Sequence, residues 1–69
     1  MSGTYKMITL VGLSRVSYED AIQNAVQQAS ATLRSLAWFE VKECRGKIQG
    51  DRVTEWQVKL QVGFKIENP

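Results

Sequence analysis

A stretch near the end of the chain, "RVTEWQVKLQVGFKI" at residues 52–66, alternates apolar and polar side chains more strictly than any other part of the sequence. One set of alternate positions is apolar: Trp56, Val58, Leu60, Val62, Phe64 and Ile66. The other set carries polar side chains: Glu55, Gln57, Lys59, Gln61 and Lys65. Because successive side chains of a strand point to opposite faces, this pattern predicts a long strand with one face in a core and one polar face.

Two other stretches predict strands. Residues 5–12, "YKMITLVG", alternate in apolar character, and residues 12–16 are typical of a connection. Residues 37–48 precede the turn residues "QGD", in which Gly50 supplies the positive φ that a tight turn needs. Gly46, inside that stretch, predicts a β-bulge.

Residues 18–34, between the first two strands, predict one amphipathic helix. Apolar residues recur at three- and four-residue steps along it and two residues past its end: Ala21, Ile22, Ala25, Val26, Ala29, Leu33 and Leu36. Ser17 followed three residues later by Asp20 is a shortened capping box, which marks the start of the helix. The fold class is therefore α+β, a β-α-β-β protomer in which a three-stranded antiparallel sheet wraps one amphipathic helix.

The length of the chain limits how it becomes stable. We expect residues 1–69 to form a single domain, and a domain of this size buries only about 60% of the surface that its unfolded chain exposes. Cys44 is the only cysteine, and the absence of histidine removes the usual zinc-ligand spacings. Since neither a disulfide nor such a metal site is available, we expect a homo-oligomer.

Composition excludes several classes of function. Nine basic and seven acidic residues are interspersed and give a net charge of +2, which is not the basic footprint of a nucleic-acid-binding protein. No apolar run approaches the length of a membrane span, and we expect no signal peptide in "MSGTYKMITL". The single cysteine favours a reducing cytoplasm.

The stretch "SLAWFEVKE" at residues 35–43 places an unusual residue on the polar face. If it is a strand, Phe39 shares the core face with Val41, while Trp38 shares the opposite face with Glu40 and Lys42. A tryptophan among charges has two interpretations: packing in a subunit interface, or an aromatic platform for a flat ligand.

Gln57 is expected on the same face of the sheet as Trp38. With the turn at residues 50–51, simple hairpin pairing places Gln57 near Cys44 and Trp38 near Gly63. Six residues of strand rise separate the two positions by about 20 Å. Both side chains can therefore contact one small ligand only if neighbouring subunits each contribute one. By itself, the position of Gln57 favours an ordinary solvated strand residue over a ligand contact.

Three motifs, taken in order, resemble those of a known family. They are V-G-x-S-x-x-S-aromatic-E-D-A at residues 11–21, T-L-R-x-L-x-W-x-E-V at residues 32–41, and aromatic-Q-V-x-L-x-V-x-F at residues 56–64. Together they resemble the dodecins, small flavin-binding proteins, over nearly the whole chain from Tyr5 to Lys65.

The resemblance implies both an assembly and a ligand. Dodecins are β-α-β-β protomers that form hollow dodecamers, in which flavins bind in antiparallel pairs between tryptophans at two-fold interfaces. By resemblance, Trp38 is the stacking tryptophan, Gln57 hydrogen-bonds the polar edge of the isoalloxazine ring, and Arg45 supports the flavin or its phosphate. The implied function is non-enzymatic storage of FMN or riboflavin, with the excited state quenched by the tryptophan.

The sequence leaves open whether a second ligand binds and which charged residues contact a phosphate. Some bacterial dodecins also carry coenzyme A, and Arg34, Lys6 and Lys65 are candidates for contact with a phosphate of FMN or coenzyme A, or are ordinary solvated charges. Trp56, where the family commonly has tyrosine, is expected to pack in the core. Cys44 is expected to be an inert side chain.

Two alternative functions compete with flavin storage. One is a structural oligomer, or a coenzyme A carrier, in which Trp38 packs in an interface. The other is a flavin-dependent enzyme, which the sequence disfavours because it has no histidine and no evident acid–base pair. We therefore expect no catalytic residue and no metal site.

Overall fold

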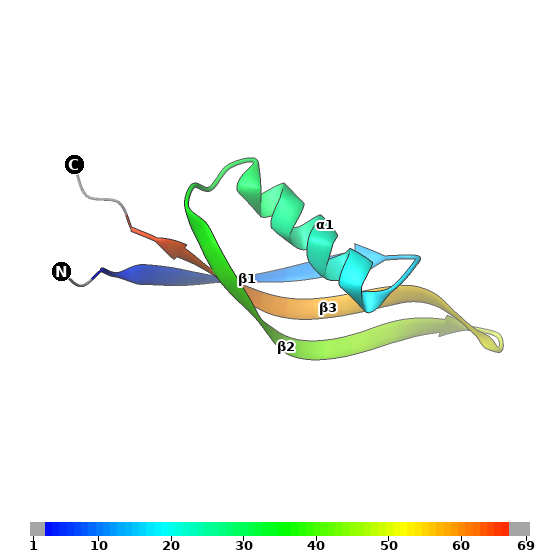
Figure 1. Ribbon diagram of the computed structural model, residues 1–69. Helices are drawn as coiled ribbons and strands as arrows, with labels where there is room; N and C mark the ends of the chain where they lie inside the picture. Colours follow the sequence, from blue (N-terminus) through cyan, green and yellow to red (C-terminus); the bar gives the residue numbers. More distant parts are fainter. Residues whose placement is uncertain (1–2, 67–69) are drawn as a thin grey trace.

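The chain forms two layers, with one helix on one face of a three-stranded antiparallel sheet (Figure 1). The computed structural model describes residues 3–66. Its elements are β1 (Tyr5–Ser14), α1 (Tyr18–Ser30), β2 (Leu36–Gln49) and β3 (Arg52–Lys65). The strand order is β1-β3-β2, so the strictly alternating strand is the central one. The predicted β-α-β-β architecture is confirmed.

The core lies between α1 and the central strand. We call the face of the sheet beneath the helix the inner face, and the opposite face the outer face. The buried residues of the core come from one stripe of α1 and alternate positions of β3: Ala21, Ala25, Val58, Leu60 and Val62. The helix contributes small alanines, which let its backbone approach the sheet closely. Gly12 of β1 lies directly beneath the Ala21 carbonyl group, where no Cβ has room.

The helix begins where the sequence predicts and ends earlier. The Oγ atom of Ser17 accepts a hydrogen bond from the backbone N–H of Asp20 at 3.0 Å, which confirms the N-cap. The helix ends at Ser30, so the prediction of residues 18–34 was wrong at its C-terminal end. Ser35 adopts a φ of 60°, and this left-handed residue turns the chain so that Leu36 begins β2 instead of extending the helix.

The first strand is longer than predicted, because residues 12–14 belong to it. Gly12 pairs with Val58, and β1 continues to Ser14, so the start of the predicted connection was wrong. A glycine in a strand pattern suggests a break, but here it permits close approach of the helix. The Ser14 Oγ atom donates to Asp20 Oδ2 at 2.6 Å and accepts from the N–H of Val16 at 2.8 Å, which ends the strand.

The pairing of β2 with β3 contains irregularities, but none of them lies at the predicted bulge. Gly46 pairs with Trp56 in regular register, so the prediction of a bulge at Gly46 was wrong. The register shifts between Val41 and Glu43, among other places, so Lys42 is the extra residue there. Lys42 can be the extra residue of a β-bulge because most bulges do not require a glycine at that position. Gly50 has a φ of 68°, as predicted for the turn.

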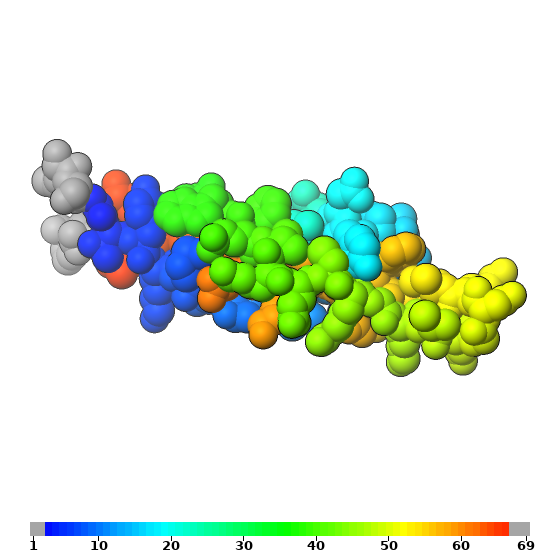
Figure 2. Space-filling model, turned by 90° about the horizontal axis from the view of Figure 1, so that it is seen from below, coloured from blue at the N-terminus to red at the C-terminus, as the bar shows by residue number. Residues whose placement is uncertain are grey.

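The helix covers β1 and β3 but leaves the inner face of β2 exposed. Phe39 and Val41 point to the inner face, as predicted, yet they are 48% and 44% exposed. The expectation that they lie in the core was wrong, because a helix about 10 Å wide covers only two strands about 4.8 Å apart. The β2–β3 hairpin also extends beyond the helix in a molecule 53 Å long (Figure 2), where Ile48 is 72% exposed.

These exposed apolar side chains support the expectation that the chain associates with other chains. Within residues 3–66, no helix is long and apolar enough to cross a membrane.

Candidate functional site

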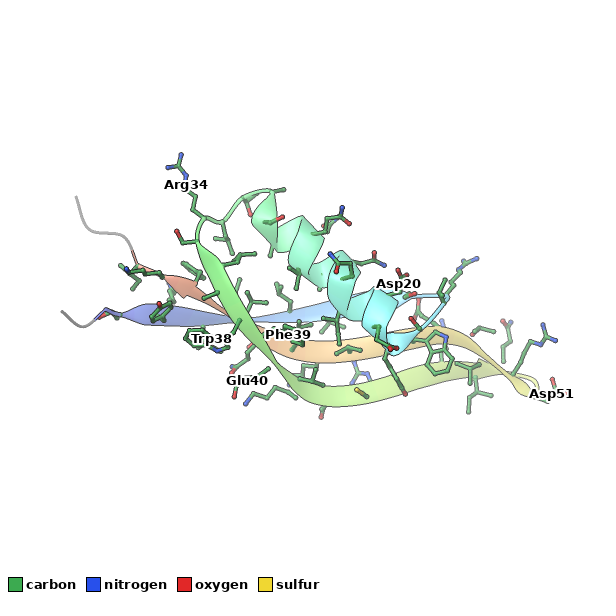
Figure 3. The ribbon with its side chains drawn as sticks, viewed as in Figure 1. Asp20, Arg34, Trp38, Phe39, Glu40 and Asp51 are labelled. Carbon is green, nitrogen blue, oxygen red and sulfur yellow. The ribbon has the colours of Figure 1, made fainter. Side chains whose placement is uncertain are left out.

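The outer face of the sheet carries both side chains that the sequence singles out. Trp38 of β2 lies opposite Gly63 of β3, as predicted. Gln57 lies opposite Arg45, so the predicted pairing with Cys44 was wrong by one residue because the register shifts between Lys47 and Ile48. Figure 3 shows Trp38 on the side of the sheet away from the helix, with Phe39 directed toward the helix side. The prediction that Trp38 shares the polar face is confirmed.

The indole ring of Trp38 lies over a glycine. A Cβ atom at Gly63 would lie 2.8 Å from the Cε2 atom of Trp38 and 2.9 Å from the Sδ atom of Met7. The ring of Tyr5 lies beside the indole, with centroids 4.7 Å apart and planes inclined by 48°. Trp38 nevertheless remains 45% exposed. Gly63, Met7 and Tyr5 therefore support the indole as a half-exposed aromatic platform on the outer face.

We expect Gly63→Ala to displace the indole without unfolding the chain. The added methyl group meets Trp38 and the flexible side chain of Met7, not backbone, so we expect a cost of roughly 1 kcal/mol in the free energy of unfolding. In a Trp56→Phe background, where Trp38 is the only tryptophan, its emission should shift to longer wavelength as the ring leaves the sheet. Gly3→Ala is the matched control, and unchanged emission of the Gly63→Ala variant would contradict the platform geometry.

A polar cluster forms the other end of the outer face. The Nε atom of Arg45 donates a hydrogen bond to Oε1 of Gln57 at 2.8 Å, and Nε2 of Gln57 donates to Oε1 of Glu55 at 2.8 Å. The Nη1 atom of Arg45 also lies 3.8 Å from Oε1 of Glu43 in an exposed ion pair. We call Arg45, Gln57 and Glu55 the amide cluster. No sequence motif pointed to Glu55 as a functional residue; only its position two residues before Gln57 could have suggested it.

The platform and the amide cluster lie far apart within one chain. Gln57 and Gly63 are six positions apart on β3, which corresponds to about 20 Å of strand. This separation agrees with the sequence-based prediction. A single flat ring cannot rest on Trp38 and reach Gln57 of the same chain.

The three predicted phosphate contacts are dispersed over the molecule. Lys65 is exposed on the outer face opposite Tyr5, close to the platform. Lys6 pairs with Phe64 and therefore belongs to the inner face. Figure 3 shows Arg34 on the connection between α1 and β2, pointing away from Trp38. Within one chain, only Lys65 shares both the face and the end of the sheet with Trp38.

Trp56 and Cys44 lie away from the outer face. The ring of Trp56 packs edge-on against Tyr18, with centroids 4.9 Å apart, which confirms that it is a packing residue. Cys44 is an exposed free thiol opposite Val58 on the inner face. It therefore faces away from Trp38 and Gln57. In the part of the chain that the structure describes, no three His, Cys, Asp or Glu residues are grouped to hold a metal ion.

Comparisons with known proteins agree with this geometry over almost the whole chain. A family model described as Dodecin matches residues 4–67. The dodecin of Thermus thermophilus is 52% identical over 67 residues, which is 97% of each chain. The crystal structure of the T. thermophilus dodecin W38F mutant covers 97% of this chain and 100% of its own, with 49% identity and a TM-score of 0.93.

A further solved structure, the dodecin from Streptomyces coelicolor, is 45% identical and gives a TM-score of 0.92. It covers 97% of this chain and 96% of its own. The family match and these similarities extend along the helix and all three strands, including the platform and the amide cluster. The chain therefore belongs to the dodecin family.

Proposed function

We propose that this protein is a non-enzymatic flavin-binding protein that stores FMN or riboflavin by stacking it on Trp38 and quenching its excited state. The observation that carries the proposal is the half-exposed indole supported over Gly63, among the polar side chains that β2 and β3 present on the outer face. Membership in the dodecin family, whose members bind flavins, supports the same assignment. A flavin supplies a flat ring for stacking and a polar pyrimidine edge for hydrogen bonding.

The binding site is proposed to be shared between chains in a dodecamer. Because about 20 Å of strand separates the platform from the amide cluster, one chain presents Trp38 while a neighbour presents Gln57 and Arg45. The exposed apolar residues on the inner face of β2, Phe39 and Val41, supply a second surface for association. Under this proposal, ligand binding requires assembly, because no single chain carries the complete site.

The phosphate of FMN has one candidate partner near the platform in the same chain. Lys65 lies on the outer face beside Tyr5, so its ammonium group can pair with a phosphate at the edge of the site. Lys6 and Arg34 lie elsewhere on the protomer, where assembly with other chains would be needed to bring them to a flavin or to coenzyme A. The free thiol of Cys44 favours the cytoplasm as the compartment.

The proposed function is binding and not catalysis, because stacking occupies the faces of the flavin ring. Stacking on Trp38 covers the face at which a substrate would react, and the chain has no histidine for proton transfer. A structural oligomer is the competing function, since a half-exposed indole also suits a protein interface.

The proposal is tested by titrating the purified protein, sized in solution, with FMN and with riboflavin. We expect flavin emission to fall at a fixed stoichiometry on a particle of about twelve chains, because the stacked indole quenches the bound ring. Flavin that keeps its emission beside an intact oligomer would contradict storage and favour the structural role. If the protein oxidised a nicotinamide donor in a flavin-dependent reaction faster than free flavin does, that result would instead support the flavin-dependent enzyme.

A further inference from the structure

We infer that Glu55 is a positioning residue that fixes the amide of Gln57 so that this amide recognises the N3–H edge of a flavin. The inference rests on the proposed function and extends it to a residue with no role there. It starts from two hydrogen bonds in the amide cluster: 2.8 Å from Arg45 Nε to Gln57 Oε1, and 2.8 Å from Gln57 Nε2 to Glu55 Oε1.

The two partners determine which way the amide of Gln57 points. A guanidinium N–H can only donate a hydrogen bond, so the atom that faces Arg45 must be the amide oxygen. A carboxylate can only accept, so the atom that faces Glu55 must be the amide nitrogen. If the amide rotated by half a turn, its nitrogen would face the N–H donor of Arg45 and its oxygen would face the carboxylate acceptor of Glu55. Neither pair could form a hydrogen bond. Arg45 and Glu55 therefore exclude the reversed amide.

The oriented amide keeps hydrogen-bonding capacity for a ligand. A primary amide has two N–H donors and two acceptor lone pairs on its oxygen, and the cluster uses one of each. One donor and one acceptor of Gln57 remain. The pyrimidine edge of a flavin presents an N3–H donor between two carbonyl acceptors, which is the complement of that pair.

Glu55 is the better fixed of the two partners. Glu55 and Gln57 are two positions apart on the central strand, so their side chains point to the same face without any cross-strand adjustment. Glu55 is half-buried, whereas Arg45 is exposed and its Nη1 atom is shared with Glu43 at 3.8 Å. The carboxylate of Glu55 is thus the more rigid anchor of the amide.

The test compares riboflavin with N3-methylriboflavin, which lacks the N3–H donor, by emission titration of the assembled protein. In the wild-type protein, we expect the N3-methyl compound to bind at least about tenfold more weakly, because a buried acceptor loses its partner. In Glu55→Ala, we expect riboflavin to bind about fivefold more weakly while the N3-methyl compound changes less than about twofold. The ratio of the two dissociation constants should therefore fall.

A second variant and a charge-matched control complete the design. Glu55→Lys places a second donor beside the amide, which competes with Arg45 for the amide oxygen and removes the single preferred orientation, so it should lower the ratio at least as far as Glu55→Ala. Glu19→Ala removes the same charge from α1, away from the outer face, and should keep the wild-type ratio. A wild-type ratio in both Glu55 variants overturns the inference. If the wild-type protein binds neither compound, the proposed function fails first, so the two failures are distinguishable.

Discussion

Trp38→Ala should weaken flavin binding by at least about 100-fold while the assembled particle persists. The indole is 45% exposed before a ligand covers it, so removal takes away both apolar burial and ring stacking. A loss of about 3 kcal/mol, from burial of the ring together with stacking, corresponds to a factor of about 100 in the dissociation constant. The measurement is an emission titration on protein sized before and after the addition of flavin.

Trp38→Phe is the control that separates loss of the ring from loss of tryptophan. A phenyl ring over Gly63 keeps a flat surface, so we expect binding to weaken by only about tenfold. Quenching should fall further than affinity, because phenylalanine is a poorer electron donor than indole. Retained affinity in Trp38→Ala would contradict the platform. Dissociation of the particle in that variant would favour the alternative in which Trp38 packs an interface.

The platform could be located from the sequence because alternation is a local property. Trp38 and Phe39 are adjacent, so they must point to opposite faces in any strand. Counting back from the turn at Gly50 pairs Trp38 with Gly63 and separates it from Gln57. The structure has the same pair because the register shift between Lys47 and Ile48 is offset by the extra residue Lys42. These steps need only the strand period and one turn, and they gave the correct partner for Trp38 but not for Gln57, which pairs with Arg45 instead of Cys44.

The neighbours of the platform could not be predicted in the same way. Tyr5 and Met7 reach Trp38 because β1 pairs with β3, and the strand order β1-β3-β2 is a tertiary property that no local pattern contains. Without that order, the alternation of residues 5–12 shows which β1 side chains share a face but not which strand lies beside them.

The face of Arg45 could not be derived from alternation either. Counting by twos from Trp38 along β2 places Arg45 on the inner face with Phe39. The extra residue at Lys42 reverses the parity, so Arg45 lies opposite Gln57 on the outer face and Cys44 takes the inner position. The resemblance to dodecins placed Arg45 near the ligand, and the bulge at Lys42 is the physical reason that it can share a face with Trp38 and Gln57.

The close approach of α1 to β1 depends on Gly12, and Gly12→Ala should destabilise the protomer severely. The added Cβ would overlap the carbonyl oxygen of Ala21 and would lie 2.9 Å from its carbonyl carbon and 3.0 Å from the Cβ of Ala25. These are backbone atoms and a short side chain of a packed helix, so no rotamer change relieves the overlap. The helix must move away from the sheet, which separates Ala21 and Ala25 from Val58 and its neighbours in the core.

We expect Gly12→Ala to lower the free energy of unfolding by about 3 kcal/mol or more, against a total of roughly 3–10 kcal/mol for a domain of this length. Urea unfolding followed by circular dichroism, at one fixed chain concentration, measures the difference. Gly3→Ala is the control: its nearest neighbour is the flexible end of Lys65 at 3.4 Å, so a change within about 0.5 kcal/mol is expected. Equal urea midpoints for the two variants would mean that α1 does not rest on Gly12 in solution. A selective loss in Gly12→Ala would show that this contact holds the helix on the sheet.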